Sequence, residues 1–151
     1  MRSETAGITP ASAGLDGITW HILGQTYVPK SLTADSFSWH ATFPDGTFVP
    51  PHIHPLQDEY LYILEGRLEF WLDGEDTSAG PGDLVRLPRG RPHGIFNRSC
   101  ATATCLFWVS PTGRLFELFQ GIHDLPVQEP GAVVALSARH DVEFLPPPLG
   151  T

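Results

Sequence analysis

Residues 46–66 read GTFVPPHIHPLQDEYLYILEG, and they carry the most informative pattern in the chain. Two histidines, His52 and His54, are separated by one residue. In an extended strand such residues point to the same face, so their imidazoles converge and can serve as neighbouring ligands of one metal ion. The chain has seven histidines in 151 residues, and about 0.3 such triplets are expected by chance. Taken alone, the pair also fits two surface or hydrogen-bonded histidines.

Two further residues strengthen the metal interpretation. Glu59 follows His54 at an odd offset, which would place it on the wrong face of one continuous strand. A turn over residues 55–58 would instead let Glu59 begin the next antiparallel strand and point back inward. His93 follows a proline-bounded turn, residues 88–92. Prolines limit the backbone freedom around these side chains, which favours a rigid site.

The spacing of these residues resembles the two sequence motifs of the cupin family. The first motif is matched by Gly46, five residues, His52-x-His54, four residues, Glu59, six residues and Gly66. The second is matched by Gly82, five residues, Pro88-x-Gly90, two residues, His93, three residues and Asn97. The resemblance implies a small double-stranded β-helix that binds one divalent metal through His52, His54, Glu59 and His93. Residues 54–66 and 111–119 also resemble the quercetin dioxygenase-like single-domain cupins.

The rest of the chain indicates an all-β protein. Short apolar runs alternate with turns rich in the 15 glycines and 15 prolines, which favours a jelly-roll barrel. Residues 59–64 and 67–72 flank Glu65-Gly66, a pattern that predicts a hairpin with a two-residue turn. After residue 110 the apolar period becomes helical, which predicts short helices over 114–121 and 132–139.

Three segments are therefore expected. Residues 1–17 form a flexible arm or a docked edge segment, residues 18–110 form the cupin barrel, and residues 111–151 form a helical and Pro-rich C-terminal tail. We also expect a homodimer, because the polar arm is long enough to reach a neighbouring sheet edge and protect it.

Charge and composition exclude several partners. The formal net charge is -8, with 17 acidic and 9 basic residues, so neither nucleic acid nor an anionic membrane is an expected partner. No apolar run is long enough to span a bilayer. The N-terminal residues lack the apolar core of a secretory signal. Cys100 and Cys105 would point to opposite faces of a strand, which disfavours a disulfide. A cytoplasmic protein is the expectation.

Four ligands on a six-coordinate ion leave two positions open for a small-molecule substrate and for O2 or water. Imidazole and carboxylate suit Fe, Mn, Ni, Co, Cu or Zn, and the sequence does not choose among them. Glu59 has a second candidate role as the catalytic base that takes a proton from a phenol or enol. A purely structural role as a ligand is the alternative.

Strand parity predicts the walls of the substrate pocket. Phe48 shares the face of His52, Leu61 and Ile63 share the face of Glu59, and Ile95 shares the face of His93. These residues would form an apolar cavity, although a filled barrel core explains each of them equally well. His40 is a further candidate if the polar face of its strand looks inward.

Three functions remain open on the sequence. The first is an oxygenase, of the quercetinase-like dioxygenase type, acting on a phenolic or enolic small molecule. The second is an oxygen-independent metal-dependent cyclase, isomerase or lyase, such as a polyketide cyclase. The third is a non-catalytic ligand-binding barrel, which the complete ligand set disfavours.

Overall fold

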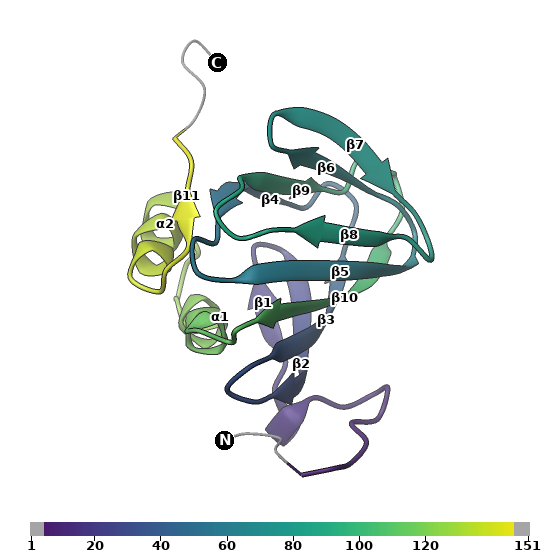
Figure 1. The fold of residues 1–151 in the computed structure, drawn as a ribbon, viewed down its shortest axis with the longest axis vertical. Helices are drawn as coiled ribbons and strands as arrows, with labels where there is room; N and C mark the ends of the chain where they lie inside the picture. The colour runs from purple at the N-terminus through teal and green to yellow at the C-terminus, as the bar shows by residue number, and fades with distance from the viewer. Residues whose placement is uncertain (1–4, 147–151) are drawn as a thin grey trace.

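The computed structural model describes residues 5–146, which form two antiparallel β-sheets with two helices across one end (Figure 1). The six-stranded sheet has the order β1 (Trp20–Ile22), β2 (Gln25–Leu32), β3 (Phe37–Phe43), β10 (Ala103–Ser110), β5 (Asp58–Glu65) and β8 (Leu84–Leu87). The five-stranded sheet has the order β11 (Glu143–Phe144), β4 (Phe48–Ile53), β9 (His93–Phe96), β6 (Leu68–Leu72) and β7 (Glu75–Ala79). The helices are a 3-10 turn (Leu15–Gly17), α1 (Leu115–His123) and α2 (Pro130–Ala138). The all-β prediction with a helical C-terminal part is confirmed.

Strand alternation builds the core. In β3 the residues Phe37, Trp39, Ala41 and Phe43 are all buried, whereas the residues between them are only half-buried. The neighbouring strand β10 alternates in the same way, and the rings of Trp39 and Phe107 stack with centroids 5.0 Å apart. One face of the six-stranded sheet thus turns inward along its whole length.

The hairpin predicted at Glu65-Gly66 is wrong. Strand β5 pairs with β10 and β8, and β6 pairs with β7 and β9, so the chain crosses from one sheet to the other at this turn. Gly66 has a φ of 77°, and a Cβ there would lie 2.6 Å from the carbonyl oxygen of Thr102. Both strands carry an inward apolar row, and packing face to face buries both rows.

The described part of the predicted arm is docked on its own chain. Thr9 donates a hydrogen bond to the carbonyl of Lys30 in β2. The Lys30 ammonium in turn donates to the carbonyls of Pro10, Ala11 and Ala13. The first four residues of the arm, and residues 147–151 of the Pro-rich tail, lie outside the described residues. The homodimer stays a prediction.

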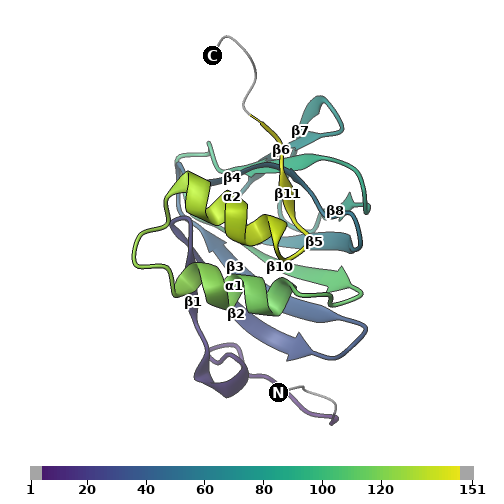
Figure 2. The same cartoon turned by 90° about the vertical axis from the view of Figure 1, so that its left-hand side faces the viewer.

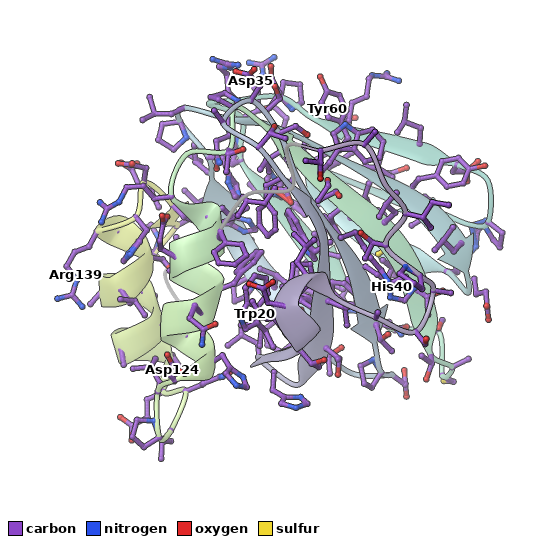
Figure 3. The ribbon with its side chains drawn as sticks, turned by 90° about the horizontal axis from the view of Figure 1, so that it is seen from below. Trp20, Asp35, His40, Tyr60, Asp124 and Arg139 are labelled. Atoms are coloured by element: carbon purple, nitrogen blue, oxygen red, sulfur yellow. The ribbon has the colours of Figure 1, made fainter. Side chains whose placement is uncertain are left out.

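The two helices close one end of the barrel, side by side in Figure 2. They overlap the two predicted helical segments and differ from them by one or two residues at each end. Helix α1 buries Leu115, Leu118, Phe119 and Ile122, which share one helical face. Trp20 of β1, labelled in Figure 3, anchors this helix by donating its indole N–H to Gln120 Oε1 at 2.9 Å. Within residues 5–146 no helix is long and apolar enough to cross a membrane.

Candidate metal centre

The structure brings His52, His54, Glu59 and His93 together. All four are buried, and one ligand atom from each lies within 4.8 Å of the others. Glu59 Oε2 lies 3.0 Å from His54 Nε2 and 3.7 Å from His93 Nε2. The four residues that the motif resemblance implies as ligands thus converge on one point inside the barrel.

The backbone explains this convergence. His52 in β4 stands directly opposite His93 in β9. The chain then turns after His54 and enters the other sheet as β5, whose second residue is Glu59. The amide of Gly90 donates to the carbonyl of His54 at 3.0 Å and ties the two motif turns together. The odd offset of Glu59 is therefore resolved by a turn, as expected.

Burial sets the protonation of the site. Burial and the nearby His54 lower the pKa of His52 to about 3. Burial, together with the neighbouring His52 and His54, also lowers the pKa of His93 well below its ordinary value. Burial raises the pKa of Glu59, although His54 acts in the opposite direction. His52 and His93 therefore stay neutral near pH 7 and keep a lone pair for a metal ion.

Two unpaired atoms show that this donor set fits a divalent transition metal. In the described part of the chain, the buried atoms Glu59 Oε2 and His93 Nε2 have no hydrogen-bond partner. Leaving such groups unpaired in a protein interior is costly. A cation between these atoms would satisfy both, and imidazole with carboxylate is a common ligand set for metals from Mn to Zn.

Gln57 orients His54 and was missed from the sequence. Its Oε1 lies 3.0 Å from His54 Nδ1, and its Nε2 donates to the carbonyls of Pro111 and Thr112. The two carbonyls fix which way the amide points, so Oε1 accepts the Nδ1 proton and Nε2 of the imidazole keeps its lone pair toward Glu59. The carbonyl of Pro50 does the same for His52 Nδ1 at 2.8 Å. Gln57 occupies an unspecified position of the motif, so the motif gave no signal for it.

We expect Gln57→Leu to weaken metal binding about 10- to 100-fold, the usual effect of removing a hydrogen bond to a ligating histidine. Affinity is measured by competition with a chromogenic chelator. Gln128→Leu is the matched control, because Gln128 also makes three hydrogen bonds, to Leu23, His21 and Ile122, and none to a ligand. Both variants should lose similar stability. An equal loss of metal affinity in both would contradict the role of Gln57.

A cavity of about 50 Å³ lies against the ligands. Its polar wall includes His52, His54 and Glu59, and its other walls come from both sheets and both helices. The apolar and aromatic side chains along it are Ile22, Leu23, Tyr27, Trp39, Val49, Ile95, Phe107, Leu115, Leu118, Phe119, Ile122, Val133, Val142 and Phe144. The helical walls were not foreseen from the sequence, since strand parity says nothing about how the C-terminal helices dock.

Only one of the four residues that strand parity placed in the pocket wall lines this cavity. Ile95 lines the cavity. Leu61 and Ile63 are fully buried but are not among its lining residues, so they belong to the filled core. Contrary to the parity prediction, Phe48 does not line this cavity, because its side chain is 49% exposed and stacks on Phe96. The β4–β9 pairing is irregular between Val49 and His52, which reverses strand parity and puts Val49 on the cavity face.

The prediction for His40 is also wrong. His40 alternates with the inward residues Trp39 and Ala41, so its side chain lies on the outer face of β3. Figure 3 shows it on the side of the barrel away from the two helices. Burial and the nearby Lys30 lower the pKa of His40.

Comparisons with known proteins agree with this architecture. A cupin domain family model matches residues 39–109. The chain is 34% identical over 105 residues to the tetracenomycin polyketide synthase protein TcmJ of Streptomyces glaucescens, a match that covers 69% of this chain and 70% of that protein. It is 34% identical over 50 residues to quercetin 2,3-dioxygenase of Bacillus subtilis, which covers 33% of this chain and 15% of that enzyme. Among solved structures, KdgF from Halomonas sp. superposes with a TM-score of 0.60 at 22% identity, over 71% of this chain and 94% of that one, which is evidence for the fold alone.

Proposed function

The chain belongs to the cupin superfamily, and from that premise we propose that it is a metal-dependent enzyme acting on a phenolic or enolic small molecule of the polyketide type. One observation carries the proposal: three imidazoles and a carboxylate, all buried, converge on one point, and three of these four residues, His52, His54 and Glu59, line a mostly apolar cavity. Perturbed titratable groups beside a cavity are typical of catalytic sites.

His52, His54, Glu59 and His93 would hold the metal. A divalent cation bound there would polarise a substrate oxygen and make the attached O–H group more acidic. Because His52 and His93 stay neutral near pH 7, they supply lone pairs and no protons. The remaining chemistry falls to the carboxylate.

Glu59 is the proton acceptor in this proposal. Its carboxylate would take the proton from the phenol or enol O–H group, which leaves the electron pair on the substrate as a phenolate or enolate. The apolar side chains around the cavity would exclude water, so this anion is not reprotonated by solvent. Glu59 would return the proton to the product and complete the cycle.

Two reactions can follow from such an anion. In the first, the enolate carbon attacks a carbonyl carbon of the same molecule and closes a ring without oxygen. In the second, the anion reacts with O2, as in a dioxygenase. The resemblance to the polyketide synthase protein spans 69% of the chain and that to the dioxygenase spans 33%. We therefore favour the oxygen-independent reaction, with the dioxygenase as the second candidate.

Metal analysis combined with oxygen control tests the proposal. The protein is purified without added metal, its metal content is measured, and it is incubated with phenols and enolisable diketones in air and under anaerobic conditions. Metal-dependent conversion without oxygen supports the favoured reaction, and conversion with stoichiometric O2 uptake supports the second candidate. If no member of the panel is converted by the metal-loaded protein under either condition, the proposal fails.

A further inference from the structure

An apolar groove of about 450 Å³ lies between α2 and β4, next to the metal cavity. Its volume falls in the range of small-molecule pockets. The groove and the cavity share three lining residues, Leu23, Val133 and Phe144. Figure 2 shows α2 lying across the barrel in front of β4 and beside β11. The groove and the cavity therefore adjoin at these three residues, which form the partition between them.

Phe144 is the central part of this partition. It stands opposite His52 in the β4–β11 pairing, and the two rings lie 5.2 Å apart between centroids. It belongs to a strand of only two residues, Glu143–Phe144, and is half-buried. A change of its side-chain rotamer would connect the groove to the cavity beside a metal ligand.

The groove has no free polar side chain to offer a ligand. Among its lining residues, Gln128 uses its amide on the backbone of His21, Leu23 and Ile122. Thr47 donates its hydroxyl to the carbonyl of Pro44 at 2.7 Å. The rest of the lining is apolar or glycine, including Phe48 and the exposed Val134. Such a surface suits a flat hydrocarbon body.

The cavity is also mostly apolar, but unlike the groove it contains polar groups without partners among the residues described. Besides the candidate ligand Glu59, two of its lining residues carry a buried polar atom that has no hydrogen-bond partner among residues 5–146, namely Ser137 Oγ and Trp39 Nε1. Ser137 is 1% exposed and lies one helical turn after Val133, on the same face of α2. Buried polar groups without partners are rare in folded proteins and call for an explanation. Oxygen substituents of a ligand in the cavity would supply the missing partners.

We propose that the groove and the cavity form one binding site for a planar, largely apolar molecule with oxygen substituents at one end. The hydrocarbon body lies in the groove against Val134 and Phe48. The oxygenated end passes Phe144 into the cavity, where Ser137 and Trp39 bind it beside the metal ligands. The cavity alone, at about 50 Å³, has room for the polar end and not for a ring system. This inference rests on the proposed function and specifies how its substrate is recognised.

The test uses the metal-free protein, so that binding is measured apart from catalysis. Two probes, 2-naphthol and naphthalene, are titrated and their fluorescence is followed. The wild type should bind both probes. Val134→Lys places a charge in the groove and should weaken both at least tenfold. Val127→Lys is the matched control, because Val127 is an exposed valine, 66% accessible, that does not line the groove.

Ser137→Ala tests the polar end. It should weaken 2-naphthol about fivefold, the worth of one hydrogen bond, and leave naphthalene unchanged. Because Ser137 Oγ has no partner in the described structure, the variant should unfold at the same denaturant concentration as the wild type or a higher one. The inference is overturned if the wild type binds neither probe, if Val134→Lys binds like Val127→Lys, or if Ser137→Ala weakens both probes equally.

These outcomes separate the inference from the proposed function. Binding that follows the expected pattern, with no conversion by the metal-loaded enzyme, would reject the proposed function alone. If the Val134→Lys variant binds both probes as tightly as the wild type and still converts substrate, the proposed binding site is rejected and the proposed function stands.

Discussion

Replacing both His52 and His54 with alanine is expected to abolish stoichiometric metal binding while the barrel stays folded. The double variant removes two of the four donors and leaves His93 and Glu59, which are too few to hold a transition metal tightly. The fold should persist because the main aromatic core is built on β3 and β10 of the six-stranded sheet, whereas His52 belongs to the other sheet and His54 to the turn after it. Metal content after loading and dialysis, together with circular dichroism, gives the result.

The matched control is the double variant His21→Ala, His123→Ala. These two histidines also lie close together, with ring centroids 5.7 Å apart, but they sit between β1 and α1 and outside the buried cluster. This variant should keep one metal ion per chain. A His52→Ala, His54→Ala protein that still retains one ion per chain would disprove the ligand assignment.

The barrel and the four candidate ligands could be predicted from the sequence because both depend on fixed spacings. A strand places His52 and His54 on one face, a short turn redirects Glu59, and the second motif supplies His93. The first two steps are local properties of the chain, whereas the place of His93 in the ligand set follows from the resemblance to the second cupin motif. The same local reasoning identified the C-terminal helices from their apolar period.

The rule that alternate residues of a strand share a face gave a wrong prediction where the strand was irregular. Phe48 and His52 share a face only in an ideal strand, and the pairing irregularity at Pro50-Pro51 reverses that relation. Strand β2 has no clear apolar alternation in its sequence, because Pro29 and Lys30 interrupt it, although Tyr27 of this strand lines the cavity. Local pattern also cannot show which strands pair, so the turn at Gly66 was mistaken for a hairpin.

The roles of Gln57 and Ser137 could not be predicted from the sequence because they depend on long-range contacts. Gln57 matters because it reaches the carbonyls of Pro111 and Thr112, more than 50 residues away. Ser137 matters because α2 docks over the barrel end. Neither contact leaves a periodic signal in the sequence, so only the folded structure reveals them.

Glu59→Gln is expected to reduce turnover per bound metal about 10²- to 10⁴-fold if Glu59 is the catalytic base, which is the usual contribution of a positioned base. The amide has nearly the same shape but cannot accept the proton at any metal occupancy. The wild type should also lose activity at low pH as Glu59 becomes protonated, and the variant should lack this acidic limb. The measurement is the rate at saturating metal, divided by measured metal content, across a range of pH.

Dividing the rate by the metal content distinguishes a catalytic base from a residue that only binds the metal. If Glu59 only holds the metal, the variant should bind it more weakly, and reloading should restore most of the turnover. Glu65→Gln is the matched control on the same strand, because Glu65 is exposed at the far end of β5, and it should match the wild type in both metal content and rate. A fully loaded Glu59→Gln protein with near-normal turnover would rule out proton transfer by this residue. The outcome bears on both candidate reactions, because ring closure and reaction with O2 each begin here from the phenolate or enolate that Glu59 would generate.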